Sequence, residues 1–419
     1  MKQYLCIDLK SFFASVECVE RGLDPETTDL IVADPTRSEK TICLAVTPAL
    51  KAKGVKNRCR VFQIPKNLKY ITASPRMQKY IDYSAEIYGI YLKFFAKEDI
   101  HVYSIDEVFI DATNYLKMYG LSIKELAQKV LSEIYSSLKL RAACGIGTNL
   151  FLAKVALDIT AKHSKDYIGI LDEESFKATL WNHVPLTDFW RIGSGIAKKL
   201  KKRGIFTMGE IAKADPELLY KLFGIDAELL IDHAWGREPT TIQDIKNYKS
   251  KTKCLNSGQV LSRDYSLEEA LIIVKEMADV LSIELKAKKL VATSLSLFIG
   301  FSNAVLTPGA HGSVTFKYPT NNDTEIVSYI TSLYKSITKE NLPIRRINLS
   351  FNNVLPDNSG RQIYLFENIE EENKKSRLQD TVIEIKHKFG KNAILKGMNF
   401  LPSATTIERN MQIGGHKSG

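Results

Sequence analysis

Three carboxylates stand where the apolar pattern of the sequence predicts β-strands. Asp8 closes the apolar run YLCIDL, and Asp106 and Glu107 lie side by side in HVYSIDEVFIDA (101–112). The second run predicts a hairpin with the acidic pair at or near its turn. On neighbouring strands the three carboxylates would meet at one sheet end, where two Mg²⁺ ions would balance their charge and support an in-line phosphoryl displacement. Spacing alone does not separate this site from three carboxylates on surface loops.

A glycine turn followed by a basic segment is the second pattern with chemical meaning. The turn IGSG (192–195) precedes five lysine and arginine residues within 198–203. A helix that starts just after such a turn directs free backbone N–H groups at an anion such as a phosphate. Turn and basic helix together predict a helix-hairpin-helix that holds a nucleic-acid backbone, whereas the charges alone would also fit a solvated helix face. The predicted DNA contacts are Gly193, Gly195, Lys198, Lys199 and Lys202.

Composition places the chain among ordinary globular proteins with a basic surface. It has 419 residues, 44% hydrophobic and 25% charged, with a net charge of +10, and a pI of about 9.0. Excess positive charge favours polyanionic partners, above all nucleic acid. The six cysteines form no CxxC pair, which argues against a zinc site or a disulfide framework. With no apolar run near the length of a membrane span, we expect a cytoplasmic protein with no membrane partner.

Four stretches of different texture must position these residues. Strand and helix patterns alternate over roughly the first 165 residues, which predicts an α/β or α+β domain with one main sheet. Glycine-broken helices follow from about Pro185, and a polar linker (236–253) leads to a small α+β unit that extends to about Phe351. The tail from about Leu355 shows no evident core of its own.

Five segments together resemble the Y-family of translesion DNA polymerases. They are CIDLKSFFASVE (6–17), YSIDEVFID (103–111), GIGTNLFLAKVALDITAK (145–162), FWRIGSGIAKKLKKRGIFTMGEIA (189–212) and SGQVLSRDYS (257–266). The last two look closer to the branch of the DNA polymerase V catalytic subunit than to DNA polymerase IV. The resemblance implies an α+β multidomain right-hand polymerase. Its expected parts are a palm (1–10 and 79–166), fingers (11–78), a thumb with the helix-hairpin-helix (167–238), a little finger (239–352) and a C-terminal tail (353–419).

The resemblance also assigns roles around the carboxylates. Asp8, Asp106, Glu107 and the backbone carbonyl of Leu9 match the ligands of two Mg²⁺ ions, for which Mn²⁺ can substitute. These ions would be the positive partner of the acidic pair. Ser104 matches the serine that orients the acidic hairpin.

The incoming deoxynucleoside triphosphate is expected to contact aromatic and basic residues. Phe13 matches the steric gate, a ring that leaves no room for a 2′-OH, and Phe12 beside it is at least partly a core aromatic. Lys51 and Lys162 match phosphate contacts, although the loop before Lys162 is longer than the usual pattern. Lys154 reads as structural.

Two positions depart from the family pattern. Lys10 stands where many members carry a second acidic residue, but the matching position is also non-acidic in the polymerase V branch. Pro48 stands where many members carry a tyrosine near the phosphates, so that hydrogen bond must be absent or replaced. Both changes bear on substrate positioning more than on the reaction.

The tail contains QIYLF (362–366), which resembles the sliding-clamp-binding peptides of bacterial polymerases. Gln362 would anchor it by hydrogen bonding, and Leu365 and Phe366 would fill an apolar pocket. A further strand or the start of a helix is the structural alternative. The expected partners are primer-template DNA, deoxynucleoside triphosphates, the clamp and accessory proteins of a bacterial SOS-type response. The alternatives from other classes are a nucleotide cyclase and a non-catalytic repair scaffold.

Overall fold

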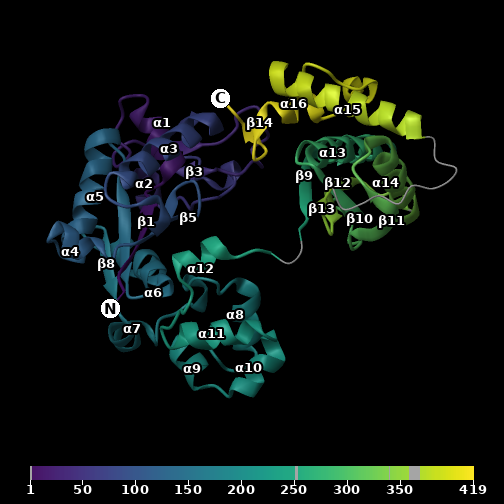
Figure 1. Cartoon of the computed structure of the whole chain (residues 1–419). Helices are drawn as coiled ribbons and strands as arrows, with labels where there is room; N and C mark the ends of the chain where they lie inside the picture. Colours follow the sequence, from purple (N-terminus) through teal and green to yellow (C-terminus); the bar gives the residue numbers. More distant parts are fainter. Residues whose placement is uncertain (1, 251–252, 339, 358–368) are drawn as a thin grey trace. The chain divides into compact units, whose positions relative to one another are not determined.

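The computed structural model describes residues 2–250, 253–338, 340–357 and 369–419 (Figure 1). The chain forms two compact units, Met1–Tyr248 and Lys249–Ser418, with Gly419 grouped with the first. No helix in the described part of the chain has the length and apolar composition needed to cross a membrane.

A five-stranded mixed sheet forms the centre of the first unit. Its strands lie in the order β5 (Ile100–Val102), β6 (Glu107–Asp111), β1 (Tyr4–Leu9), β7 (Ala142–Gly147) and β8 (Ile168–Leu171). Strand β1 runs antiparallel to both β6 and β7, whereas β7 and β8 are parallel. The predicted acidic hairpin is therefore β5–β6, and it pairs with the strand that carries Asp8.

Helices cover both faces of this sheet, which explains why β1 is apolar along nearly its whole length. Leu5 and Ile7 share one core with residues of α3 (Met77–Leu92) and α5 (Ile123–Leu138). Tyr4 and Cys6 point to the other face, where α6 (Leu150–Val155) packs. Shorter helical segments at the margins are η2 (Lys97–Asp99), α4 (Tyr115–Tyr119), η3 (Ala156–Thr160) and η4 (Ala161–His163).

A small three-stranded sheet, in the order β3-β2-β4, lies between β1 and α3 in the sequence. Its own apolar cluster includes Ile31, Val46 and Leu50. The elements of this segment are α1 (Phe12–Val19), β2 (Leu30–Val32), β3 (Ala45–Val46), α2 (Pro48–Ala52), η1 (Val61–Gln63) and β4 (Ile71–Ala73).

Residues 173–247 are helical, as the sequence predicts (Figure 1). Phe176, Phe189 and Leu200 share a core with Phe151 of α6, so this helical part is continuous with the sheet. The helices are α7 (Glu173–Leu180), η5 (Leu186–Asp188), α8 (Ser194–Lys201), α9 (Met208–Lys213), α10 (Pro216–Phe223), α11 (Asp226–Ala234) and α12 (Ile242–Asn247).

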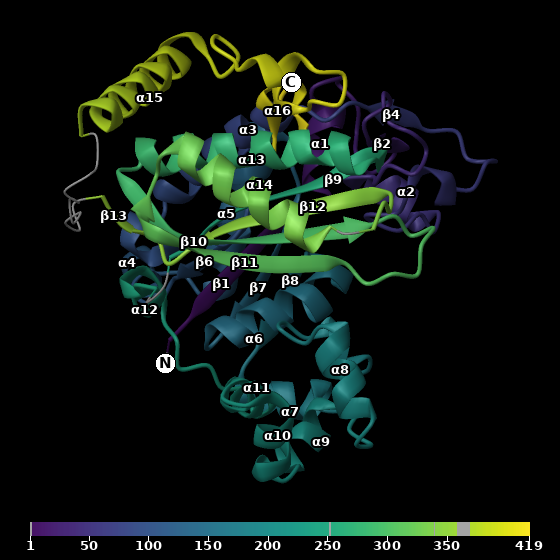
Figure 2. The same cartoon turned by 90° about the vertical axis from the view of Figure 1, so that its right-hand side faces the viewer.

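The second unit is an antiparallel sheet with helices α13 and α14 on one face (Figure 2). Inward-facing residues such as Leu295, Ile347 and Phe351 form its core with the two helices. The elements are β9 (Leu255–Tyr265), α13 (Leu267–Ala287), β10 (Leu290–Phe301), β11 (Ala310–Thr320), α14 (Asp323–Ile337), β12 (Ile344–Asn352) and β13 (Leu355–Pro356), in the strand order β11-β10-β12-β9 with β13 on β10.

The tail uses the outer surface of α13 instead of a core of its own. Glu276 of α13 is only 2% exposed, and its carboxylate accepts hydrogen bonds from Asn399 Nδ2 and from the backbone N–H of Thr405, both at 2.8 Å. Because these contacts are polar, they leave no pattern of apolar residues from which the sequence could have predicted them. The tail elements are α15 (Ile369–Phe389), η6 (Gly397–Phe400), α16 (Thr406–Asn410), β14 (Gln412–Ile413) and β15 (His416–Lys417).

Two glycines of β7 let the α6–η3 segment lie directly on the sheet. A Cβ at Gly145 would be 2.0 Å from the carbonyl oxygen of Ala153, and one at Gly147 would be 2.1 Å from the amide nitrogen of Ala153. Real Cβ atoms do not approach backbone this closely, so any other residue at either position would push α6 away from the sheet.

Gly145→Ala should therefore destabilise the first unit by about 3 kcal/mol or more, because α6 must move off the sheet. Gly89→Ala is the matched control: its Cβ would meet nothing within 4 Å in helix α3, so it should be neutral or gain about 0.5–1 kcal/mol. Urea unfolding followed by tryptophan fluorescence measures both, since all three tryptophans belong to this unit. Equal stability of the two variants would contradict the close-packing argument.

Candidate active site

The structure brings the predicted carboxylates to one end of the central sheet. Asp8 of β1 lies directly opposite Glu107 of β6 in the antiparallel register. Asp106 precedes Glu107 in the turn, and its backbone carbonyl accepts the N–H of Leu9 at 3.1 Å. Leu9, whose carbonyl was predicted as a metal ligand, thus closes the same strand end. Asp8 and Glu107 thus face each other at one strand end, with Asp106 next to them in the chain.

Hydrogen bonds hold the turn of the acidic hairpin from two sides. Ser104 Oγ donates to Asp106 Oδ1 at 2.6 Å, in keeping with its predicted orienting role. The backbone N–H groups of Tyr103 and Ser104 both donate to the carbonyl of Glu107, at 3.0 and 3.1 Å. From helix α3, Ser84 Oγ donates to the carbonyl of Ile105 at 2.6 Å. Ser84 is a contact that the sequence analysis did not single out.

Burial, more than the neighbouring negative charge, makes Asp8 hard to ionise. Burial raises the pKa of Asp8 to about 6; the nearby Lys162 opposes this shift, while Asp106 and Glu107 add to it. A carboxylate that is hard to ionise gains from a positive partner.

Two lysines already supply part of that positive charge. Lys154 Nζ lies 2.8 Å from Glu107 Oε1, and Lys162 Nζ lies 3.2 Å from Asp8 Oδ2. Burial opposes the charge of Lys154, but Cys6, Asp158 and Glu107 together raise the pKa of Lys154 above its ordinary value. The sequence analysis named only metal ions as the partner of the acidic pair, and that account is incomplete.

Asp158 joins these two lysines and was missed in the sequence. Its carboxylate lies 3.0 Å from Lys154 Nζ and 2.8 Å from Lys162 Nζ. Lys154 lies four residues before Asp158 and Lys162 four residues after it, a spacing that predicts two ion pairs along a helix. The intervening residues form a π-helical segment, η3, which takes up an extra residue per turn. This segment lies just before Lys162, where the sequence pattern looked longer than usual.

The donors at this sheet end match a hard divalent cation in type but not in their present arrangement. Asp8, Asp106, Glu107 and the Leu9 carbonyl offer only oxygen, which Mg²⁺ prefers. Yet in the parts of the chain described, no three carboxylate, histidine or cysteine side chains are placed to hold one ion together. Lys154 and Lys162 draw two of the carboxylates toward themselves. The chemistry of the donor set fits; metal binding would require these side chains to turn from the lysines.

The two phenylalanines after Asp8 have different environments. Phe12 is buried in the core, as predicted, whereas Phe13 is partly exposed and stacks on Tyr80 with ring centroids 4.4 Å apart. Tyr80 donates its hydroxyl to Glu17 at 2.8 Å, and Glu17 accepts from Arg76 Nε at 2.9 Å. Tyr80 therefore sets the position of the Phe13 ring, which no sequence pattern indicated.

Lys51 and Pro48 belong to the short helix α2. Pro48 is the first residue of that helix, where its missing N–H costs nothing. Lys51 Nζ donates to Ser11 Oγ at 2.8 Å. Burial lowers the pKa of Lys51, while Asp8 favours its charge. Lys51 thus lies beside the segment that joins Asp8 to Phe13.

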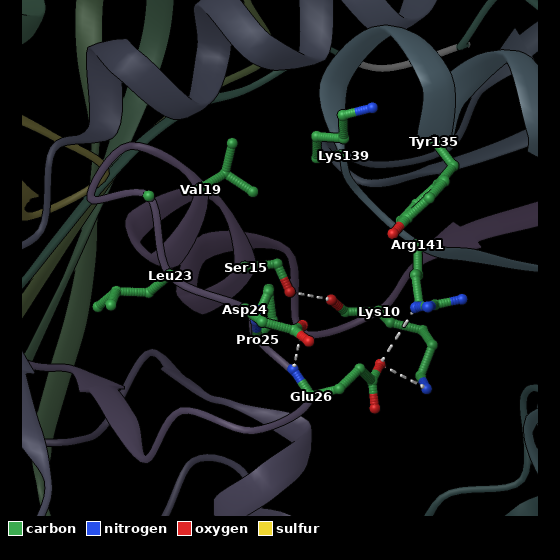
Figure 3. A pocket seen from close by; sticks show the side chains of 11 residues that line it. Lys10, Ser15, Val19, Leu23, Asp24, Pro25, Glu26, Tyr135, Lys139 and Arg141 are labelled. Atoms are coloured by element: carbon green, nitrogen blue, oxygen red, sulfur yellow. Dashed lines mark hydrogen bonds and ion pairs between the residues drawn. The ribbon is translucent and has the colours of Figure 1, made fainter.

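Lys10 lines a cavity of about 370 Å³, where its side chain lies next to Glu26 (Figure 3). Its Nζ lies 3.2 Å from Glu26 Oε1 and 4.0 Å from the centre of the Tyr167 ring. Arg141 approaches the same oxygen of Glu26 at 3.9 Å. The departure at Lys10 therefore places its charge on Glu26 and not at the acidic pair.

The predicted DNA contacts form a separate group on α8. Gly193 caps this helix, and a Cβ at Gly193 or Gly195 would meet nothing within 4 Å, so the turn is open. Lys198 and Lys202 are exposed, whereas Lys199 Nζ donates to the carbonyl of Leu222 at 3.2 Å. The first turn of α8 contains no acidic residue. The clamp-peptide residues Gln362, Leu365 and Phe366 lie outside the described residues.

The raised pKa of Asp8 predicts a pH-dependent stability in metal-free protein. Because the folded pKa, about 6, exceeds the unfolded value of about 4, the contribution of Asp8 is full below pH 4 and is lost as pH rises through 6. The free energy of unfolding relative to Asp8→Asn should fall by up to about 3 kcal/mol from pH 4 to 7. Denaturant unfolding with a chelator present measures this difference.

Asp172 provides a control of opposite sign. Hydrogen bonds from Ser175 lower the pKa of Asp172, so its contribution should be lost as pH falls instead of as it rises. The burial argument would be contradicted if the free energy of unfolding, relative to Asp8→Asn, stayed constant or rose from pH 4 to 7.

Comparison with known proteins agrees with this geometry. Residues 7–158 match the model of the impB/mucB/samB family, and residues 253–365 match that of the impB/mucB/samB family C-terminal domain. The chain is 33% identical over 420 residues to UvrX of Bacillus subtilis, a protein named for UV-damage repair, with 100% of this chain and 98% of UvrX covered. It is 29% identical to DNA polymerase IV 2 of Halalkalibacterium halodurans, with 99% of each chain covered.

A solved structure shares the fold. A Y-family DNA polymerase chimera of Dbh and Dpo4 superposes with a TM-score of 0.65 at 20% identity, and the match covers 84% of this chain and 99% of the chimera. The predicted α+β right-hand architecture is confirmed by this likeness. The matches are also consistent with the predicted branch. This chain belongs to the impB/mucB/samB family, that of the Y-family translesion DNA polymerases.

Proposed function

We propose that the protein extends a DNA primer opposite damaged template by phosphoryl transfer at the β1–β6 sheet end. The observation that carries the proposal is the pairing of Asp8 with Glu107 beside Asp106, with two lysines within ion-pair distance of the same carboxylates. Acids gathered in this way serve to hold cations, and a lysine that can leave them, as the more exposed Lys162 can, serves to bind an anionic substrate. The names of the relatives, UV-damage repair protein and DNA polymerase, support translesion synthesis as the setting.

Asp8, Asp106, Glu107 and the Leu9 carbonyl would hold two Mg²⁺ ions, or Mn²⁺ in their place. Such ions neutralise charge on the attacking and leaving oxygens of a phosphoryl transfer. Ser104 keeps Asp106 oriented for this purpose. Lys154 is nearly buried and would keep its ion pair with Asp158 when Glu107 turns to a metal ion, so it stays in place as a structural cation.

Lys162 and Lys51 would bind the triphosphate of the incoming deoxynucleotide. Lys162 is more exposed than Lys154, with a side-chain exposure of 40% against 10%, and it contacts Asp8 from the solvent side of the site. A triphosphate carries enough charge to draw it away from Asp8 and Asp158. Lys51 needs only to exchange the hydroxyl of Ser11 for a phosphate oxygen.

We further propose that the chain is organised as palm (1–10 and 79–166), fingers (11–78), thumb (167–238), little finger (239–352) and tail (353–419), with the correction that residues 239–248 pack with the first unit and not with the little finger. The thumb turn with Gly193, Gly195, Lys198 and Lys202 would hold the DNA backbone. Lys199 contributes less, because its ammonium caps the carbonyl of Leu222. The clamp peptide 362–366 and the accessory partners of an SOS-type response rest on the sequence resemblance alone.

Primer extension with Mg²⁺ and four deoxynucleotides, on undamaged and abasic templates, tests the central proposal. Asp106→Asn should lower the rate at least 10³-fold, since it removes a metal ligand without changing the shape of the turn. Asp111→Asn, at the opposite end of β6, is the matched control and should retain activity. Consumption of free triphosphate without primer extension would indicate a cyclase, and DNA binding without either reaction would indicate a scaffold.

Phe13 should exclude ribonucleotides through the ring that Tyr80 holds in place. Phe13→Ala is expected to reduce discrimination between deoxy- and ribonucleotides by about 10²-fold or more, because the space for a 2′-OH opens. Single-nucleotide insertion kinetics with both sugars measure this ratio. Phe94→Ala removes another partly buried ring of the same core and should leave the ratio unchanged. Unchanged sugar discrimination in Phe13→Ala would remove Phe13 from this role.

A further inference from the structure

Trp190 connects the glycine turn of α8 to the acidic hairpin. It precedes Gly193, the cap of α8, by three residues. Its Nε1–H donates to the hydroxyl of Tyr103 at 3.1 Å. The Trp190 ring lies 6.0 Å from the Tyr103 ring and 5.8 Å from the Phe109 ring, centre to centre. One side chain from the helical part thus contacts both arms of the β5–β6 hairpin.

Tyr103 is part of the turn that presents the acids. Its backbone N–H bonds the carbonyl of Glu107 at 3.0 Å, and the next residue, Ser104, holds the Asp106 carboxylate. The Tyr103 side chain is 47% exposed, so surrounding core packing does not fix it. Its edge-on contacts with Trp190 and Phe109 and the indole hydrogen bond therefore set the position of this arm of the turn.

Trp190 also contacts buried rings beyond the hairpin. Its ring stacks on His233 at 6.1 Å, and His233 stacks on Phe151 of α6 at 4.1 Å. His233 Nε2 lies 3.0 Å from Glu238 Oε2, and both side chains are buried. The Arg191 guanidinium lies 4.8 Å from the centre of the Trp190 ring. Trp190 is therefore held between the acidic hairpin and the helix that carries Lys154.

We infer that Trp190 is a positioning residue that couples DNA held at the Gly193–Gly195 turn to the orientation of Asp106 and Glu107. This rests on the proposed function. When a bound DNA backbone displaces the turn, Trp190 moves with it. The Trp190–Tyr103 hydrogen bond then moves Tyr103, which directly precedes Ser104. The alternative is that Trp190 only stabilises the joint between the sheet and the helices.

Kinetics separate the two roles. Trp190→Phe keeps a ring but removes the indole N–H, and Tyr103→Phe removes only the hydroxyl at the other end of the bond. Each should lower the single-turnover rate at saturating nucleotide about tenfold, with the Kd for primer-template DNA changed less than twofold. The double variant should be no slower than either single variant, because both remove the same bond.

Trp181→Phe is the matched control. Trp181 also lies in the helical part and donates its Nε1–H, to the carbonyl of Ala234 at 2.8 Å, but its ring packs edge-on against Trp235 and not against the hairpin. The Trp181→Phe variant should leave the single-turnover rate unchanged. If the rate losses of the two single variants multiply in the Trp190/Tyr103 double variant, or if Trp181→Phe is as slow as Trp190→Phe, Trp190 is only a stabilising residue.

A second measurement needs no turnover and so separates this inference from the proposed function. The chain has three tryptophans, and replacing Trp181 and Trp235 by Phe leaves Trp190 as the sole reporter. Its fluorescence should change on addition of primer-template DNA and, separately, of Mg²⁺, and Asp106→Asn should abolish the Mg²⁺ response. A Trp190 signal that responds to DNA but not to Mg²⁺, or to neither, overturns the coupling even if the protein extends primers. Both responses without primer extension would support the coupling and count against the proposed reaction.

Discussion

The balance of charge at the end of the central sheet is the constraint on which the first unit depends. Asp8 and Glu107 are neighbours in the strand register, and Asp106 is adjacent in the chain. Carboxylates this close repel one another and are costly to ionise when partly buried. Lys154 and Lys162 relieve that cost, and Asp158 in turn relieves the repulsion between the lysines. The site is therefore a network of alternating charges before any substrate or metal arrives.

Backbone packing makes this network possible. Lysine side chains reach the sheet end because α6 and η3 lie against β7 at distances that only glycine permits. Gly145 and Gly147 are thus as much part of the site as the charges, although neither carries a functional group. The π-helical turn then sets Lys162 on the same side as Lys154. The acidic hairpin is held from the other side by Ser84 and by the aromatic contacts of Tyr103.

In the second unit, polar contacts take the place of an apolar core at the tail. Lys396 lies 2.6 Å from Asp279 of α13 and 2.5 Å from Asp323 of α14, while Asn399 and Thr405 satisfy the buried Glu276. A charge buried in this way needs every partner present, so the tail and α13 specify one another. Without the tail, nothing would account for acidic residues at buried positions of α13, a helix that packs on a sheet.

The sequence by itself determined the strands, the amphipathic helices, the three carboxylates and their likeness to a polymerase family, because these depend on local periodicity and on short contiguous motifs. It also indicated that Phe12 is a core residue and Lys154 a structural one. Only the tertiary structure decided which cation lies on which acid, that Lys10 turns to Glu26, and that Tyr80, Ser84 and Trp190 hold the site in position. Those contacts join residues tens of positions apart, and their geometry follows from how closely helices approach a sheet, which no local pattern records.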